Sequence, residues 1–141
     1  MSIVYKIACK NPLITDVYIG STTNFIKRCY EHKSACKRQN RGGKLYKCIA
    51  DNGDWVNWEM TQLEVVEGGK KDLRIRERYW IENLKSSLNI DIPTMTRAEY
   101  YIKNKEQFAE YYQKNKEKIA KQMAEYYRIK KNSKQRLVSD S

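Results

Sequence analysis

Four side chains near the start of the chain have types and spacing that suit acid–base chemistry on an anion. They are Tyr5, Tyr18, Arg28 and His32, and His32 is the only histidine of the sequence. A phenol or an imidazole can accept a proton, and an imidazole does so near neutral pH without help from its surroundings. An arginine offers a planar, permanently charged set of donors that matches a phosphate or a carboxylate. These four residues are therefore the candidate catalytic residues.

The elements that must position these side chains are a hairpin and a helix. Ile3–Cys9 and Val17–Gly20 are rich in β-branched and aromatic residues and flank a stretch that begins Lys-Asn-Pro, which predicts two strands joined by a loop. The polar stretch after the second strand supplies N-cap candidates for a helix over 25–37. One tyrosine lies near the middle of each strand, so all four side chains can converge at one end of the hairpin.

The helix predicted over 25–37 has an apolar stripe formed by Phe25, Cys29 and Cys36. Arg28 and His32 are four residues apart and lie along one edge of this stripe. An arginine at the rim of a core can also serve packing alone, with its alkyl chain buried and its charge in water. The pattern therefore leaves both a chemical and a packing role open for Arg28.

Three more elements are predicted before residue 93. Apolar residues at helical spacing predict a helix over 44–52, which Gly53 is suited to end in a left-handed conformation. Residues 58–66 have the pattern of a strand, and its alternation slips after Gln62, which indicates a bulge. A further helix is predicted over 71–85. Together with the hairpin these elements predict an α+β fold, a three-stranded antiparallel sheet flanked by helices.

Glu77 is the most informative single residue of the helix over 71–85. It falls inside the apolar stripe that Leu73, Trp80 and Ile81 define. A carboxylate on a buried face costs several kcal/mol unless a partner compensates its charge. One such partner is an arginine, with Arg28 the first candidate. The other is a hard divalent cation, which prefers oxygen ligands.

The ordered set of these residues resembles the GIY-YIG endonuclease superfamily over about residues 3–90. The set comprises Ile3-Val4-Tyr5, Tyr18-Ile19-Gly20, Arg28, His32, Glu77 and Asn89. Ile3 stands where the family usually has a glycine, which is a backbone feature and carries no chemical group. The resemblance implies that Glu77 is the ligand of a Mg²⁺ or Mn²⁺ ion and that Gly20 and Asn89 support the site. It also implies a tyrosine as the base, while His32 stays open as the alternative.

The net charge of +11 and a pI near 9.5 favour a polyanionic partner, nucleic acid before membrane. Basic residues occupy the end of the first predicted helix, the loop after it and the start of the second helix. They form a candidate nucleic-acid-binding rim made of Lys33, Lys37, Arg38, Arg41 and Lys44. A run of charges can equally be a solvated face. No run of about 18 apolar residues is present to span a bilayer, and the N-terminus enters a strand directly, so we expect a soluble intracellular protein without a membrane partner.

The composition changes near residues 91–96, which predicts a domain boundary there. Glu99–Ala109 recurs eleven residues later as Glu110–Ala120, and eleven residues are close to three helical turns. We therefore expect residues 1–93 to form a nuclease-like domain, 97–131 one long basic amphipathic helix, and 132–141 a disordered tail. Arg97 to Ser141 holds twelve Lys/Arg against six Asp/Glu. The helix lysines expected to contact nucleic acid are Lys103, Lys105, Lys114, Lys116 and Lys118.

Together these features predict a metal-dependent endonuclease that hydrolyses DNA phosphodiester bonds, with the C-terminal helix adding DNA affinity. Two alternatives belong to other classes. One is a DNA-binding module that has kept this fold and lost turnover. The other is an assembly protein that forms a homodimer through its C-terminal helix, with glutamates and lysines paired across the seam.

Overall fold

The computed structural model describes residues 1–38 and 42–139, with side chains as far as residue 135. The elements in chain order are β1 (Ser2–Cys9), β2 (Val17–Thr22), α1 (Phe25–Cys36), α2 (Lys44–Asp51), the 3-10 turn η1 (Trp55–Asn57), β3 (Trp58–Val66), α3 (Lys70–Asn83), α4 (Arg97–Lys103) and α5 (Lys105–Ser139). Every strand and helix predicted for residues 1–93 is present, with ends no more than two residues from the prediction.

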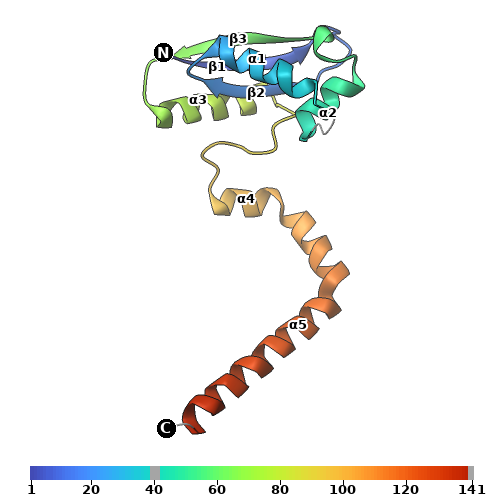
Figure 1. Ribbon diagram of the computed structural model, residues 1–141, viewed down its shortest axis with the longest axis vertical. Coiled ribbons are helices and arrows are strands. Elements are labelled where there is room, and N and C mark those ends of the chain that lie inside the picture. The colour runs from blue at the N-terminus through green and yellow to red at the C-terminus, as the bar shows by residue number, and fades with distance from the viewer. Residues whose placement is uncertain (39–41, 140–141) are drawn as a thin grey trace. The chain divides into compact units, whose positions relative to one another are not determined.

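The three strands form one antiparallel sheet in the order β2-β1-β3. In the register of the hairpin, Tyr5 pairs with Gly20 and Ile7 pairs with Tyr18. Side chains of paired residues lie on the same face of a sheet. Tyr5 and Tyr18 therefore share one face of the hairpin, and the predicted α+β architecture is confirmed (Figure 1).

The predicted bulge in β3 is also confirmed. Val4 pairs with Glu64 and Tyr5 pairs with Gln62, so Leu63 is the additional residue on β3. A bulge of one residue moves the following side chains to the opposite face. The slip in the apolar pattern after Gln62 is the sequence signal of this change of sheet face.

The sheet separates two hydrophobic clusters. On one face Tyr5 and Ile7 pack with residues of α1 and α2, among them Cys36 and Ile49. On the other face Val4, Ile19 and Val66 pack against Leu73 and Ile81 of α3. Helices α1 and α2 thus cover one face of the sheet and α3 covers the other (Figure 1).

The position of His32 corrects the sequence-based interpretation of α1. We predicted His32 at the edge of the apolar stripe, whereas it is 1 % exposed and, with Cys36, forms the buried face of the helix. The reason is tertiary, because the ring of Trp55 stacks on the imidazole from η1. Helical spacing alone cannot show that a side chain from another element will pack on a helix residue and bury it.

The chain divides into two compact units, Met1–Met95 and Thr96–Ser141. In the second unit two predictions are wrong. The single predicted helix is interrupted at Asn104, which lies between α4 and α5. The helix also continues to Ser139, eight residues beyond the predicted end at 131, because straight-chain lysines, glutamine and arginine favour helix.

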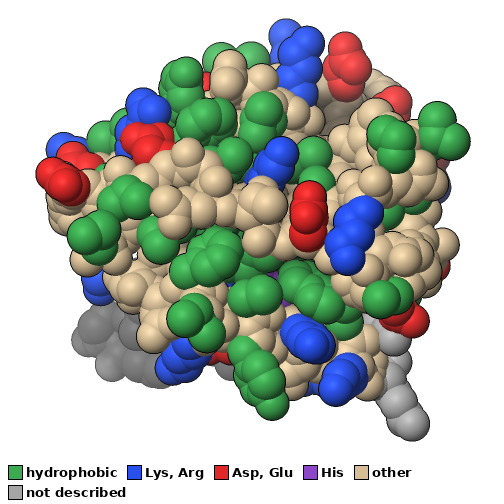
Figure 2. Space-filling view, turned by 90° about the horizontal axis from the view of Figure 1, so that it is seen from above, with side chains coloured by type: hydrophobic (Ala, Val, Ile, Leu, Met, Phe, Trp, Pro, Cys, Tyr) green, Lys and Arg blue, Asp and Glu red, His purple; other side chains and the backbone are tan. Residues whose placement is uncertain are grey.

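No helix in the described part of the chain is long and apolar enough to cross a membrane. Figure 2 shows one face of the molecule, on which Lys and Arg side chains stand singly between hydrophobic and acidic ones. The positive charge is therefore not gathered into one continuous patch on that face.

Candidate active site

A pocket of about 370 Å³ lies beside β2, one of the two edge strands of the sheet. Because α1 and α3 cover opposite faces, a pocket that both helices line must wrap around this edge. Its polar lining residues include Tyr18 of β2, Arg28 and His32 of α1, Tyr46 of α2, and Arg74 and Glu77 of α3. The pocket therefore gathers four of the five residues proposed from the sequence for catalysis and metal binding.

Glu77 is half-buried in this pocket, and its carboxylate has little compensation. Oε2 accepts a hydrogen bond of 2.5 Å from the hydroxyl of Ser21. Burial raises the pKa of Glu77, while the Ser21 hydrogen bond and the charges of Arg74 and Arg28 act against this. Within residues 1–38 and 42–135 no lysine or arginine forms an ion pair with it, because Arg28 pairs with Glu31 instead. The alternative of an ion pair between Glu77 and Arg28 is therefore not found.

The donor set around Glu77 fits a magnesium ion. Among the described residues no group of three His, Cys, Asp or Glu side chains could hold a metal without other ligands. Mg²⁺ typically uses one or two carboxylates and completes its shell with water and substrate phosphate oxygens. Glu77 supplies such a carboxylate at the wall of an open pocket, where a cation would also compensate its burial.

Arg28 is oriented by hydrogen bonds to the residues around it. Nε donates to the Tyr5 hydroxyl at 3.1 Å, and Nη1 donates to Glu31 at 3.1 Å. The guanidinium also lies within hydrogen-bonding reach of the Tyr18 side chain. The arginine is thus fixed in orientation at the wall of the pocket that it lines.

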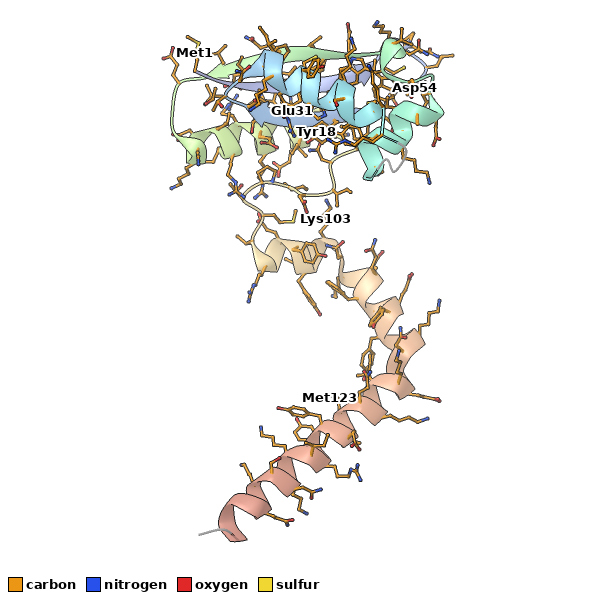
Figure 3. The ribbon with its side chains drawn as sticks, in the orientation of Figure 1. Met1, Tyr18, Glu31, Asp54, Lys103 and Met123 are labelled. Carbon is orange, nitrogen blue, oxygen red and sulfur yellow. The ribbon has the colours of Figure 1, made fainter. Side chains whose placement is uncertain are left out.

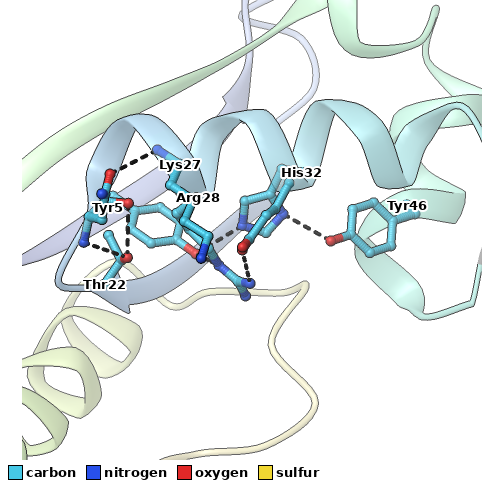
Figure 4. Close-up of polar contacts among 8 residues, drawn as sticks. Tyr5, Thr22, Lys27, Arg28, His32 and Tyr46 are labelled. Atoms are coloured by element: carbon cyan, nitrogen blue, oxygen red, sulfur yellow. Dashed lines mark hydrogen bonds and ion pairs between the residues drawn. The ribbon is translucent and has the colours of Figure 1, made fainter.

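His32 is held on both ring nitrogens by tyrosines. Nε2 lies 2.9 Å from the Tyr5 hydroxyl and Nδ1 lies 2.9 Å from the Tyr46 hydroxyl, as Figure 4 shows along α1. Burial lowers the pKa of His32 to about 4, and the charge of Arg28 adds to this effect. The imidazole is therefore neutral at physiological pH and has no free lone pair directed at the pocket.

Comparison with known proteins decides the family. The profile of the GIY-YIG catalytic domain matches residues 1–89. The chain belongs to the GIY-YIG family. Its fold is similar to the solved catalytic domain of homing endonuclease I-TevI, with a TM-score of 0.55 and 29 % identity over 64 % of this chain and 99 % of that one.

A second solved structure is similar to the same degree. It is a mutant of the catalytic domain of intron endonuclease I-TevI, with a TM-score of 0.56 and 28 % identity over 67 % of this chain and 98 % of that one. No curated protein matches the chain. The GIY-YIG match ends at residue 89, before the second compact unit begins at Thr96.

The two tyrosines of the GIY-YIG motifs differ in their access to the pocket. Tyr5 is fully buried, and burial raises the pKa of its phenol well above the ordinary value even though the hydrogen bond from Arg28 lowers it. Tyr18, which is labelled in Figure 3, lines the pocket, and it packs with the hydrophobic cluster on the face that α1 and α2 cover. Burial also raises the pKa of Tyr18, and the charge of Arg28 again acts against the shift. Only Tyr18 is therefore placed to meet a bound molecule.

Asn89, the last residue of the GIY-YIG match, completes the edge of the sheet. Its Oδ1 accepts from the backbone nitrogen of Ile19 at 2.8 Å, and its Nδ2 donates to the backbone oxygen of Ile19 at 2.8 Å. The side chain thus takes the place of a neighbouring strand. It fixes β2 directly beside Tyr18, and Asn89 also lines the pocket.

Among the pocket residues that were not proposed from the sequence are Arg74, Tyr46 and Asp91. Arg74 lies three residues before Glu77 on α3, so helical spacing around Glu77 was a signal that could have found it. Tyr46 has no such signal, because its contact with His32 joins two helices.

The described residues of the predicted basic rim line two different hollows or are exposed. Lys44 lines the pocket that contains Arg28 and Glu77 and donates to the backbone oxygen of Ser87. Lys33 and Lys37 line a different hollow, together with Trp55. Arg38 follows the end of α1 and is exposed, and Arg41 lies outside the described residues.

Proposed function

We propose that this protein is a Mg²⁺-dependent endonuclease that hydrolyses phosphodiester bonds in DNA. The observation that carries the proposal is one pocket that contains a half-buried carboxylate without an ion-pair partner among the described residues, an oriented arginine and a tyrosine. Membership of the GIY-YIG family supports it. The similar solved structures, which are catalytic domains of a homing and an intron endonuclease, support it too.

Arg28 is proposed to bind a non-bridging oxygen of the phosphate that is cleaved. Arg28 lines the pocket, and a guanidinium binds phosphate oxygens through two parallel hydrogen bonds. Tyr5 is a positioning residue in this proposal, because it is fully buried and acts through the hydrogen bond that it accepts from Arg28.

Tyr18 is proposed to orient the attacking water and to accept its proton once the phenol is ionised. The raised pKa of Tyr18 makes the neutral phenol a weak base at pH 7, so positive charge near the hydroxyl is needed. Arg28 supplies part of that charge. His32 is the poorer candidate, because a pKa of about 4 and two tyrosine contacts leave it without basic capacity.

Glu77 is proposed to hold the Mg²⁺ ion. When bound, such an ion would supply charge that stabilises the developing negative charge on the phosphate and at the leaving oxygen. Ser21 keeps the Glu77 carboxylate in place through its hydrogen bond. Arg74 lines the same pocket and adds a second positive charge near the carboxylate.

Incubation of the protein with supercoiled plasmid tests this function. Relaxed or linear product is expected with Mg²⁺ or Mn²⁺ and none with EDTA. Glu77→Gln should reduce the rate by about 100-fold or more, since removal of a metal ligand removes the charge stabilisation it provides. Its affinity for the same DNA in EDTA should stay within about twofold, because Arg28 and the lysines are unchanged.

Glu82→Gln is the matched control, because it removes the same charge from α3 at an exposed position outside the pocket. It should cleave at the wild-type rate. Cleavage by Glu77→Gln at the wild-type rate would reject the metal role of Glu77. A wild-type protein that binds plasmid without cutting it in either metal would instead identify a DNA-binding module without turnover.

The C-terminal unit is proposed to add DNA affinity. Helix α5 carries exposed lysines at Lys114, Lys116 and Lys118 around a stripe of half-exposed aromatic residues that includes Phe108 and Tyr112. Lysines that neutralise phosphates release counterions, which provides sequence-independent affinity. Since the GIY-YIG match ends at residue 89, this unit lies outside the matched catalytic domain.

A further inference from the structure

Four side chains from three elements form one continuous chain of hydrogen bonds. Tyr46 of α2 contacts His32 of α1, His32 contacts Tyr5 of β1, and Tyr5 contacts Arg28 of α1 (Figure 4). The two contacts to the imidazole are 2.9 Å each, and the Arg28 contact is 3.1 Å. Trp55 stacks on the imidazole, and His32 is buried. The family motif accounts for three of the four residues but not for Tyr46.

The direction of each hydrogen bond follows from counting protons, beginning at Arg28. A guanidinium can only donate, so the Tyr5 oxygen accepts from Nε. The hydroxyl has one proton of its own, and its second contact is His32 Nε2. Tyr5 is fully buried and has no third hydrogen-bond partner in the described part of the chain. The Nε2 atom of His32 is therefore the only acceptor available to the Tyr5 proton among the described residues.

This count selects one form of the imidazole. If Nε2 carried a proton, the Tyr5 oxygen would accept twice and the Tyr5 proton would be buried without an acceptor, which is costly. Nε2 is therefore unprotonated. A neutral imidazole has one proton, which then lies on Nδ1 and is donated to the Tyr46 oxygen.

We propose that Tyr46 is a positioning residue for this site, because its oxygen accepts the Nδ1 proton of His32 and so keeps Nε2 free to accept the Tyr5 proton. Tyr5 then presents an oxygen lone pair to Nε of Arg28. The chain of four residues thereby fixes the orientation of the arginine that the proposed function assigns to the phosphate, and the catalytic part of the proposal rests on that function.

Nitrogen NMR of the wild-type protein tests the form of the imidazole directly. Labelling with ¹⁵N-histidine gives signals from one ring only, since His32 is the single histidine of the chain. At pH 7.5 the Nδ1 signal should be that of a protonated nitrogen and the Nε2 signal that of an unprotonated one. Free imidazole side chains favour the opposite form, so the expected result is not the default. A proton on Nε2 would overturn the proposal.

Tyr46→Phe tests the positioning role. It keeps the ring and removes the acceptor, so the population with Nδ1 protonated should fall in the same NMR experiment. The kcat for plasmid cleavage should fall by about 10- to 100-fold, as is usual when a residue behind a catalytic group is removed, with KM nearly unchanged. Tyr30→Phe is the matched control, because Tyr30 is 73 % exposed on α1, and it should leave the kcat and the NMR signals unchanged.

The experiments separate failure of this proposal from failure of the proposed function. Tyr46→Phe with wild-type NMR signals and wild-type kcat overturns the role of Tyr46 while the endonuclease assignment stands. If the wild-type protein does not cleave plasmid, the endonuclease assignment fails, and the form of the His32 ring still decides whether Tyr46 orders the chain.

Discussion

At the scale of single residues, the surroundings of each side chain determine its chemistry. His32 and Tyr18 are both weakly basic groups that line the pocket beside Arg28. Both ring nitrogens of His32 are in contact with tyrosine hydroxyls, whereas the Tyr18 hydroxyl makes no such contact with a tyrosine among the described residues. His32 has a pKa of about 4 because it is buried beside a positive charge. Cleavage rates should accordingly show no step near pH 6.5, the value of an unperturbed histidine.

The lowered pKa of His32 predicts a specific loss of stability in mild acid. Below about pH 6.5 the unfolded state takes up a proton at this residue, whereas the folded state stays neutral until about pH 4. Protons therefore favour the unfolded state across this window, and above it His32 adds no pH dependence. The free energy of unfolding should fall by about 2 kcal/mol between pH 7.5 and pH 5.0 through His32, as measured by urea titration.

His32→Gln is the control for this measurement, because glutamine does not titrate. The variant is expected to be less stable than the wild type at pH 7.5, since it loses contacts with Tyr5 and Tyr46. Its stability should nevertheless change much less between the two pH values. An equal fall in both proteins would assign the acid sensitivity to other groups.

At the scale of elements, the hairpin of β1 and β2 must approach closely for Tyr5 to reach Arg28. Gly20 pairs with Tyr5 across the two strands. A Cβ atom at Gly20 would lie 2.6 Å from Cζ of Tyr5 and would overlap its hydroxyl oxygen. The glycine of this motif is thus required for space, and its backbone conformation is one that any residue can adopt.

Gly20→Ala should therefore displace the Tyr5 ring and break its contacts with His32 and Arg28. Overpacking of this kind costs about 1–3 kcal/mol of stability, measurable by thermal unfolding. Plasmid cleavage should fall by at least about tenfold, because Arg28 loses the hydrogen bond that orients it. Gly42→Ala provides the control, since an added Cβ there meets no atom within 4 Å. Wild-type stability in Gly20→Ala would show that the hairpin adjusts without strain.

At the scale of the whole molecule, the stability and the DNA affinity of the two compact units can be tested separately. Both hydrophobic clusters of the first unit consist of residues up to Ile92 in the described part of the chain. Helices α4 and α5 have no fully buried residue among the side chains described. The core of the GIY-YIG domain is therefore complete without the second unit.

A chain that ends after Met95 should fold and retain metal-dependent nicking, but it should bind DNA more weakly. Its plot of log affinity against log salt should be shallower by several units, since each phosphate contact adds about 0.9. Replacement of Lys114, Lys116 and Lys118 by glutamine in the full chain should remove up to about three of those units without shortening the helix.

Sedimentation decides between DNA binding and assembly for the same helix. If full-length and truncated chains have equal salt slopes and only the full-length chain sediments as a dimer, α5 serves assembly. A monomeric full-length protein with a steeper slope supports the DNA role. The exposed stripe of Tyr101, Phe108 and Tyr112 is compatible with a partner in either case.

The order of elements in the first unit was predictable from the sequence because it depends on local patterns. Alternating apolar residues identified the strands, and the slip after Gln62 located the bulge at Leu63. Glu77 was recognisable because a carboxylate on an apolar helix face needs compensation, wherever the helix packs. In the second unit the eleven-residue repeat predicted helix correctly, but the same local pattern did not show that Asn104 ends α4 while the equivalent Asn115 stays within α5.

Only the tertiary structure decided which candidate groups meet the pocket. Periodicity tells which face of α1 carries Arg28 and His32, but Trp55 and Tyr46, which cover His32, come from elements much later in the chain. The burial of Tyr5, the exposure of Tyr18 to the pocket and the contact of Asn89 with Ile19 likewise depend on long-range packing. Solvation and proton positions are set by these distant neighbours, and for that reason they cannot be read from spacing along the chain.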